Sequence, residues 1–120
     1  MKQQLISLTQ QADELQTPAF VVDVQQLLAN AETARRAVSG NNTSLLFAMK
    51  SFSVAPALQS LAGAVDGFHA SSLYEAKLAR QILGDEGIVH LTTPGLREDE
   101  ADELNTLCDY ISFNSLSQWQ

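Results

Sequence analysis

The chain has 120 residues, of which 45% are hydrophobic and 18% are charged. This composition is typical of a globular protein and too apolar for a disordered one. The 14 acidic residues outnumber the 7 basic ones and give a formal charge of −7 at pH 7. Such a charge repels phosphate backbones and argues against nucleic acid or an anionic membrane surface as a partner. A cationic small molecule is compatible with it.

The sequence also argues against a membrane protein, a disulfide-linked protein and a metal-binding protein. No apolar run approaches the roughly 20 residues that span a bilayer, and the first residues carry no signal-peptide core. We therefore expect a soluble, cytoplasmic protein with no membrane partner. Cys108 is the only cysteine, so no disulfide can form within the chain. No Cys/His cluster has the spacing of a zinc site, so we expect no metal site and interpret Cys108 as a buried helix thiol.

The chain begins with a polar leader over residues 1–16, and the predicted fold starts at residue 17. A proline followed by β-branched and aromatic residues predicts a short extended segment over 17–23. Asp23 is suited to be a helix N-cap, because apolar residues recur at helical spacing over 24–38. Gly40 and the two asparagines after it predict the end of this helix.

Four apolar runs and three helical patterns then alternate along the chain. The runs cover residues 44–49, 65–70, 88–92 and 110–114, and the helical patterns cover 54–62, 73–83 and 97–107. The first run is almost continuously apolar and leads into Lys50, as expected of a parallel strand buried on both faces. Regular βα units of about 21 to 23 residues suit a closed barrel or a doubly wound sheet. Both folds bind their ligands at the carboxyl ends of the strands.

Start signals precede the predicted helices. Ser53 comes before the pattern at 54–62, and residues 72–75, Ser-Leu-Tyr-Glu, have the pattern of a capping box. Acidic residues fill the first turn at 98–100. A second capping box, Ser-Leu-Ser-Gln, covers 115–118 and predicts a further helix.

Polar side chains follow each predicted strand. Lys50 and Ser51 follow the first strand, residues 69–72 the second, residues 92–94 the third, and residues 114–115 the fourth. A lysine that ends an apolar strand is unusual, although its aliphatic stem can carry the charge to solvent without any function. Position alone leaves Lys50 open between a functional amine and a surface lysine.

Three segments, taken in order, decide between these interpretations. They read Phe-Ala-Met-Lys-Ser-Phe-Ser over 47–53, Gly-Phe-His-Ala-Ser-Ser-Leu-Tyr-Glu over 67–75, and Phe-Asn-Ser-Leu-Ser-Gln over 113–118. Together they resemble the carboxynorspermidine (carboxyspermidine) decarboxylase family, from about Thr17 to the end of the chain. That family belongs to the fold-type III pyridoxal-phosphate enzymes, with the diaminopimelate and ornithine decarboxylases, in which a barrel is followed by a β-rich domain.

The resemblance implies an α/β fold in which residues 17–120 form the first half of a (β/α)8 TIM-type barrel of the alanine racemase-like kind. A complete barrel takes roughly 250 residues, so its remainder and the C-terminal β domain would lie beyond Gln120. The resemblance also implies a pyridoxal-phosphate-dependent carboxy-lyase and a homodimer. Its small cationic amino-acid substrate would be carboxynorspermidine or carboxyspermidine, giving norspermidine or spermidine. We expect the 120 residues alone to be inactive.

By the same resemblance, Lys50 matches the Schiff-base lysine that holds pyridoxal 5'-phosphate. A desolvated ammonium loses its charge more readily and becomes a nucleophilic amine, which suits this role. His69 stands where the broader group usually has an aspartate, so it fits either a cofactor contact or a strand-end histidine satisfied by backbone groups. Ser72 and Glu75 match positions beside the cofactor pocket, although a capping box also explains them. The predicted catalytic residue is Lys50, and the predicted cofactor-binding residues are Lys50, His69 and Ser72.

Other candidates and functions are ranked lower. His90 lies inside the third predicted strand, so we expect a core or helix-facing histidine. Asn114 and Ser115 are not included, because Ser115 is explained as a helix cap. Two alternatives stay open, a diaminopimelate decarboxylase and a non-catalytic pyridoxal-phosphate-binding relative. No G-x-S-x-G elbow, G-x-G-x-x-G loop or P-loop follows a strand, which argues against a doubly wound hydrolase or dehydrogenase.

Overall fold

The structure, a computed structural model, describes residues 16, 18–40 and 42–119. Its centre is a parallel sheet of four strands in the order β1-β2-β3-β4. The strands are β1 (Leu46–Ala48), β2 (Gly67–Ala70), β3 (Ile88–Thr92) and β4 (Tyr110–Ser112). The predicted leader lies outside the described residues except for Gln16.

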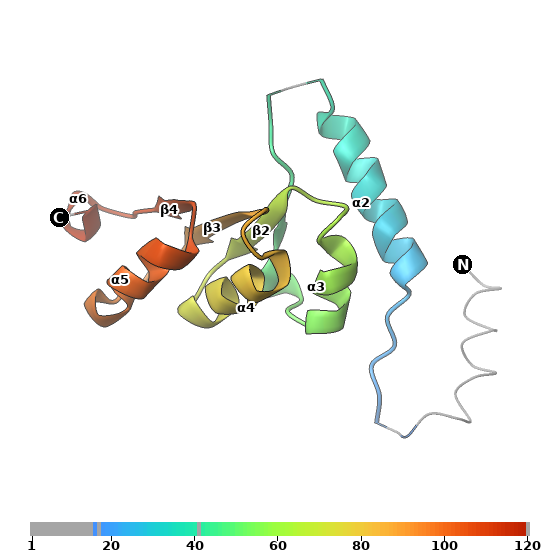
Figure 1. Ribbon diagram of the computed structural model, residues 1–120, viewed down its shortest axis with the longest axis horizontal. Helices are drawn as coiled ribbons and strands as arrows, with labels where there is room; N and C mark the ends of the chain where they lie inside the picture. Colours follow the sequence, from blue (N-terminus) through green and yellow to red (C-terminus); the bar gives the residue numbers. More distant parts are fainter. Residues whose placement is uncertain (1–15, 17, 41, 120) are drawn as a thin grey trace.

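Helices supply the crossovers that neighbouring parallel strands require. Figure 1 shows the three crossover helices side by side along the sheet, with the first helix beyond them. The helices are α2 (Val24–Val38), α3 (Ala55–Leu61), α4 (Leu73–Leu83), α5 (Glu98–Leu107) and α6 (Leu116–Trp119). The predicted alternation of parallel strands and helices is confirmed, and the sheet is consistent with part of a barrel.

Three predicted strands are shorter in the structure: the runs at 44–49, 65–70 and 110–114 give Leu46–Ala48, Gly67–Ala70 and Tyr110–Ser112. Over residues 18–23 there is no strand, and Phe20 is 97% exposed. These residues therefore do not pair with the sheet. Strand β1 ends at Ala48, and Met49–Ser51 form a single 3-10 turn, η2, that contains Lys50.

Helix capping agrees with the sequence at some ends and differs at others. The Asp23 side chain accepts a 2.9 Å hydrogen bond from the Gln26 N–H, so this predicted N-cap is confirmed. The prediction that Ser53 caps α3 is wrong, because Val54 occupies the N-cap position and the Ser53 hydroxyl donates to the Met49 carbonyl at 2.8 Å. Gly84 ends α4 with φ of +62°, a conformation that favours glycine.

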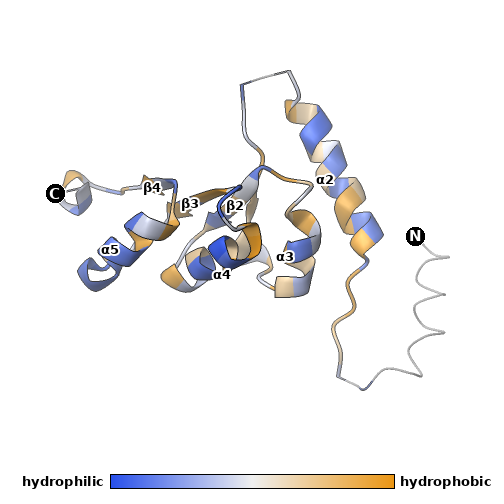
Figure 2. Ribbon diagram, viewed as in Figure 1, coloured by the Kyte–Doolittle hydropathy of each residue, from blue (hydrophilic) through white to orange (hydrophobic). Residues whose placement is uncertain are grey.

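The core lies between the helices and one face of the sheet. Phe68 and Ala70 from β2 and Val89 and Leu91 from β3 are fully buried, because alternate strand residues point to the same face. The helices contribute fully or almost fully buried side chains to this core: Leu58, Ala76, Ala79 and Leu104. In Figure 2, β3 has the hydrophobic colour and much of α5 has the hydrophilic colour.

The intervening strand residues form the opposite face of the sheet, which we call the open face. Its residues are half-buried or exposed apart from Gly67, and they are Leu46, Ala48, Gly67, His69, Ile88, His90, Thr92, Tyr110 and Ser112. Register aligns Ala48 with His69, His69 with His90, and His90 with Tyr110. Two histidines therefore stand side by side on adjacent strands of this face.

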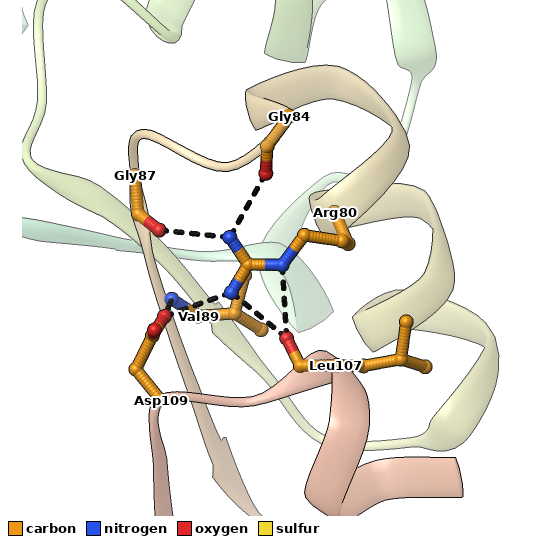
Figure 3. Close-up of polar contacts among 6 residues, drawn as sticks. All are labelled: Arg80, Gly84, Gly87, Val89, Leu107 and Asp109. Atoms are coloured by element: carbon orange, nitrogen blue, oxygen red, sulfur yellow. Dashed lines mark hydrogen bonds and ion pairs between the residues drawn. The ribbon is translucent and has the colours of Figure 1, made fainter.

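An arginine network closes the amino ends of β3 and β4. The Arg80 guanidinium donates to the carbonyl oxygens of Gly84, Gly87 and Leu107 at 2.8 to 3.1 Å. It also pairs with the Asp109 carboxylate at 2.8 Å (Figure 3). These contacts tie the carboxyl ends of α4 and α5 to the sheet at the edge opposite Lys50.

The prediction that Cys108 is a helix thiol is corrected. Cys108 is half-buried and follows the last residue of α5, where its N–H donates to the Leu104 carbonyl. Burial raises the pKa of its thiol to about 11, against a smaller opposing effect of the Arg80 charge. Among the described residues no helix has both the length and the hydrophobicity to cross a membrane.

Candidate functional site

Lys50 lies at the carboxyl edge of the sheet, directly after β1. The 3-10 turn that carries it is anchored by Met49, which is fully buried, while the Lys50 side chain is exposed. Within the described part of the chain Lys50 forms no ion pair, whereas Lys77 pairs with Glu103 at 2.8 Å. The amine is therefore available for a ligand. The desolvation expected of this lysine is not provided by the described residues.

His69 is the nearest sheet residue with a titratable side chain. It is half-buried on β2, in register with Ala48, which precedes Lys50 by two residues. Burial lowers the pKa of the His69 imidazole, and the charges of His90 and Lys50 lower it further, while Glu75 acts in the opposite direction. At neutral pH these effects favour an uncharged ring with a free nitrogen lone pair.

Ser72 is confirmed as a helix cap, and its hydroxyl accepts the Glu75 N–H at 3.2 Å. The reciprocal contact differs from the predicted capping box. The Glu75 carboxylate accepts both the N–H and the hydroxyl of Ser71, at 2.7 and 2.8 Å, rather than the N–H of Ser72. Ser72 is exposed beside the strand end, so its cap role accounts for its contacts and a further role toward a cofactor stays a prediction.

Glu75 also links β1 to β2 at this edge. One of its oxygens lies 3.4 Å from the hydroxyl of Ser53, which follows the turn that carries Lys50. On the neighbouring loops, the Asn114 amide donates to the Thr93 carbonyl at 2.7 Å. Side-chain contacts thus connect the carboxyl end of β1 with that of β2, and the carboxyl end of β3 with that of β4.

The prediction that His90 is a core or helix-facing residue is wrong. His90 shares the open face with His69, and the ring centroids lie 5.2 Å apart with an interplanar angle of 89°. Its Nε2 lies 2.8 Å from the Ser112 hydroxyl on β4. Strand periodicity could have found it, because Val89 and Leu91 are the apolar pair of β3 and His90 must face the other way.

The donor set at this edge fits pyridoxal phosphate in its chemistry. A primary amine that is free of ion pairs can react with an aldehyde, and the neighbouring imidazole can contact an aromatic ring. Lys50 and His69 supply these two groups, and Ser71 and Ser72 add hydroxyls at the start of α4. Among residues 16, 18–40 and 42–119 no group of three or more His, Cys, Asp or Glu side chains is placed to hold a metal ion.

Comparisons with curated proteins identify several similar sequences. The chain is 31% identical over 107 residues to the carboxynorspermidine/carboxyspermidine decarboxylase of Campylobacter jejuni. It is 33% identical over 106 residues to the protein of the same name from Herminiimonas arsenicoxydans. It is 34% identical over 105 residues to a carboxyaminopropylagmatine decarboxylase from Synechocystis. The matches cover 88 to 89% of this chain but only 27 to 28% of each relative. No protein-family profile matches the chain.

A solved structure gives the same result. The crystal structure of carboxynorspermidine decarboxylase from Campylobacter jejuni, complexed with norspermidine, superposes with a TM-score of 0.80 at 30% identity. The superposition covers 88% of this chain and 28% of that one. The resemblance expected from the sequence motifs is confirmed. The chain is homologous to a segment of the carboxynorspermidine/carboxyspermidine decarboxylases that makes up 28% of their length.

Proposed function

We propose that the chain forms part of a pyridoxal-phosphate-dependent decarboxylase in which Lys50 is the residue that carries the cofactor. The observation behind this proposal is the position of Lys50. Lys50 lies in a segment that is homologous to decarboxylases. Its amine lies at the carboxyl edge of a parallel sheet, where such sheets bind their ligands. The four-stranded sheet would belong to a (β/α)8 barrel of the alanine racemase-like kind.

The residues present would divide the work at this edge. Lys50 would hold pyridoxal phosphate through its amine. When bound, the cofactor supplies the electron sink that decarboxylation of an amino acid needs. His69 would contact the cofactor beside Lys50 as an uncharged ring, and the hydroxyl of Ser72 would lie at the margin of the same pocket. The Lys50 amine would also be a candidate to return a proton.

The substrate class we propose is a small amino acid that carries additional cationic groups. Carboxynorspermidine and carboxyspermidine, which would give norspermidine and spermidine, are the first choice, because two relatives are named for them. The acidic balance of the chain, with a formal charge of −7, favours a cationic ligand over an anionic one. An uncharged His69 beside Lys50 adds no further positive charge that would repel it.

A second substrate is favoured by one observation. The Synechocystis relative, at 34% identity, is named a carboxyaminopropylagmatine decarboxylase. Two other functions remain as alternatives: a diaminopimelate decarboxylase and a non-catalytic barrel that binds pyridoxal phosphate. We further propose that the enzyme acts in the cytoplasm as a homodimer.

Substrate assays of the full-length protein, loaded with pyridoxal phosphate, test this function. Carbon dioxide release is measured with carboxynorspermidine, carboxyspermidine, carboxyaminopropylagmatine and diaminopimelate, and the Lys50→Ala variant is the control. We expect release from a carboxylated polyamine and none from diaminopimelate or from the variant. Release from diaminopimelate alone would replace the proposed substrate class. Cofactor binding without release from any of the four would instead favour the non-catalytic alternative.

A further inference from the structure

A row of aromatic rings crosses the open face of the sheet beside the proposed cofactor position. His69, His90 and Tyr110 are register partners on β2, β3 and β4. The centroids of the two imidazoles lie 5.2 Å apart at 89°, and those of His90 and Tyr110 lie 6.2 Å apart at 73°. Both pairs have the edge-to-face geometry that aromatic rings prefer. The orientation of each ring is therefore limited by the next.

Ser112 fixes the middle ring of this row. Its hydroxyl lies 2.8 Å from Nε2 of His90, a full hydrogen bond in either direction of donation. Because a serine hydroxyl can either donate or accept, this contact fixes the orientation of the His90 ring in both tautomers. Ser112 forms this contact with His90, and no hydrogen bond within the described residues joins it to His69. Any effect of Ser112 on His69 must therefore pass through His90.

Charged and titratable groups face His69 from three other elements. Lys50 approaches from η2, His90 from β3 and Glu75 from α4, with Tyr110 of β4 beyond His90. Protonation of both imidazoles at this separation, next to a lysine, would gather three positive charges. The single carboxylate of Glu75 is already engaged by the N–H and hydroxyl of Ser71. The arrangement favours one uncharged state of His69.

We propose that His90 is a positioning residue for His69: anchored by Ser112, the His90 ring holds the His69 ring in one orientation beside Lys50. This inference rests on the proposed function, in which His69 contacts the cofactor, and extends the site by two residues on β3 and β4. His90 itself touches neither the proposed cofactor nor the substrate. Its contribution is to hold the His69 ring in the orientation in which His69 would contact the cofactor.

The chain is well suited to a direct test, because it contains 2 histidines. NMR of the imidazole rings reports the order of each ring, through its chemical shifts and line widths, and the titration midpoint of each histidine, without any need for activity. The variants His90→Phe and Ser112→Ala remove the ring nitrogens and the anchor, and each also helps to assign the signals. Ser112→Thr keeps a hydroxyl, and Ser60→Ala removes a hydroxyl that bonds the Pro56 carbonyl on α3. Circular dichroism confirms that each variant is folded.

We expect one sharp set of His69 ring signals in the unmodified chain. His90→Phe should raise the His69 titration midpoint, because the effect of His90 that lowers the pKa of His69 is lost, and should shift or broaden the His69 ring signals although an aromatic ring is retained. Ser112→Ala should broaden the His69 ring signals, Ser112→Thr should keep them sharp, and Ser60→Ala should have no effect. If His90→Phe does not fold, the serine series carries the test.

Unchanged His69 signals in both Ser112→Ala and His90→Phe would overturn the proposal, as would a response to Ser60→Ala of the same size. Labelling of Lys50 by pyridoxal phosphate is measured separately on the same proteins. Labelled Lys50 with an unresponsive His69 would remove the positioning role and leave the decarboxylase. If the His69 signals respond but Lys50 is not labelled, the coupling of the two rings would be supported and the proposed decarboxylase function would be contradicted.

Discussion

Asp109 binds both peptide groups of Val89: its N–H donates to the Val89 carbonyl at 2.9 Å, and its carboxylate accepts the Val89 N–H at 2.8 Å. Asp66 repeats this arrangement with Leu45, at 2.8 Å through its N–H and 2.6 Å through its carboxylate. Each aspartate directly precedes a strand and also pairs with an arginine from an earlier helix. The amino ends of the strands are thus joined by the same device twice, which leaves the carboxyl ends to carry the proposed site.

Arg80 provides the strongest test of this device. Replacing it with lysine should lower the free energy of unfolding by about 1–3 kcal/mol, because an ammonium cannot reach the carbonyl and carboxylate partners of a planar guanidinium. Arg97→Lys is the matched control. Arg97 also pairs with an aspartate, Asp99 at 2.7 Å, but its side chain is 66% exposed against 20% for Arg80. Urea titration measures both, and an equal loss in the two variants would contradict the account.

The two aspartates should make stability depend on acid pH. Hydrogen bonds from the N–H groups of Leu45 and Val89 lower the pKa of Asp66 and of Asp109, with a smaller contribution from the paired arginines. A folded pKa below the unfolded value of about 3.9 means that the unfolded state binds more protons. The stability these carboxylates provide is therefore present above that value and is lost as pH falls through their folded pKa.

Urea midpoints measured between pH 3 and pH 6 check this dependence. We expect the midpoint to fall toward pH 3, and the double variant Asp66→Asn, Asp109→Asn to show a shallower fall. Asp99→Asn is the comparison, because the pKa of Asp99 is lowered by Arg97 in an exposed pair that solvent screens. A double variant with the slope of the unmodified chain would show that other groups govern acid unfolding.

Gly67 should not tolerate a side chain. A Cβ at this position would overlap the Ile88 carbonyl on the adjacent strand, so the backbones of β2 and β3 would have to separate. We expect Gly67→Ala to destabilise the fold by about 1–3 kcal/mol or more. Gly63→Ala serves as the control, since nothing lies within 4 Å of a Cβ there. Equal thermal midpoints for the two variants would mean that the strands are not packed as described.

Cys108 should react slowly with alkylating reagents in the folded chain. Its pKa of about 11 leaves roughly a hundredfold less thiolate near pH 8 than an ordinary cysteine has. Mass spectrometry of the iodoacetamide adduct, with and without 8 M urea, measures the difference. The rate in the folded chain should rise with pH up to pH 10, and equal rates in the two conditions would contradict the burial of this thiol.

Much of the fold follows from residue patterns that act locally. The predicted strand at 88–92 and the helix at 73–83 match β3 and α4 at both ends, because an apolar strand core and a serine cap are local signals. Within the predicted segment at 17–23, the described residues 18–23 form no strand, because strand formation requires a partner that local sequence does not specify. Ser53 was misassigned for a related reason, since its hydroxyl reaches the carbonyl of Met49 instead of the next helix.

The candidate site was predicted in part. Lys50, His69 and Ser72 lie at the carboxyl ends of β1 and β2, as the strand-end rule predicts, and their role toward a cofactor stays a prediction. His90 was predicted to be a core or helix-facing residue because it lies inside a strand. The face of the sheet on which it lies decides its environment instead. Its contact with Ser112 joins residues 22 positions apart, and only the strand register reveals it. The Arg80 network was not predicted either, because its acceptors are mostly backbone carbonyls that no motif records.

The most direct measurement for the central claim is the attachment site of the cofactor. The protein is incubated with pyridoxal phosphate and reduced with borohydride, and the label is located by intact mass and peptide mapping. Lys2, Lys50 and Lys77 are the lysines of the chain, and Lys77 is already paired with Glu103. We predict one label per chain on Lys50, and none in Lys50→Arg. A label spread over Lys2 and Lys77, or the absence of any label, would make Lys50 a surface lysine and contradict the decarboxylase account.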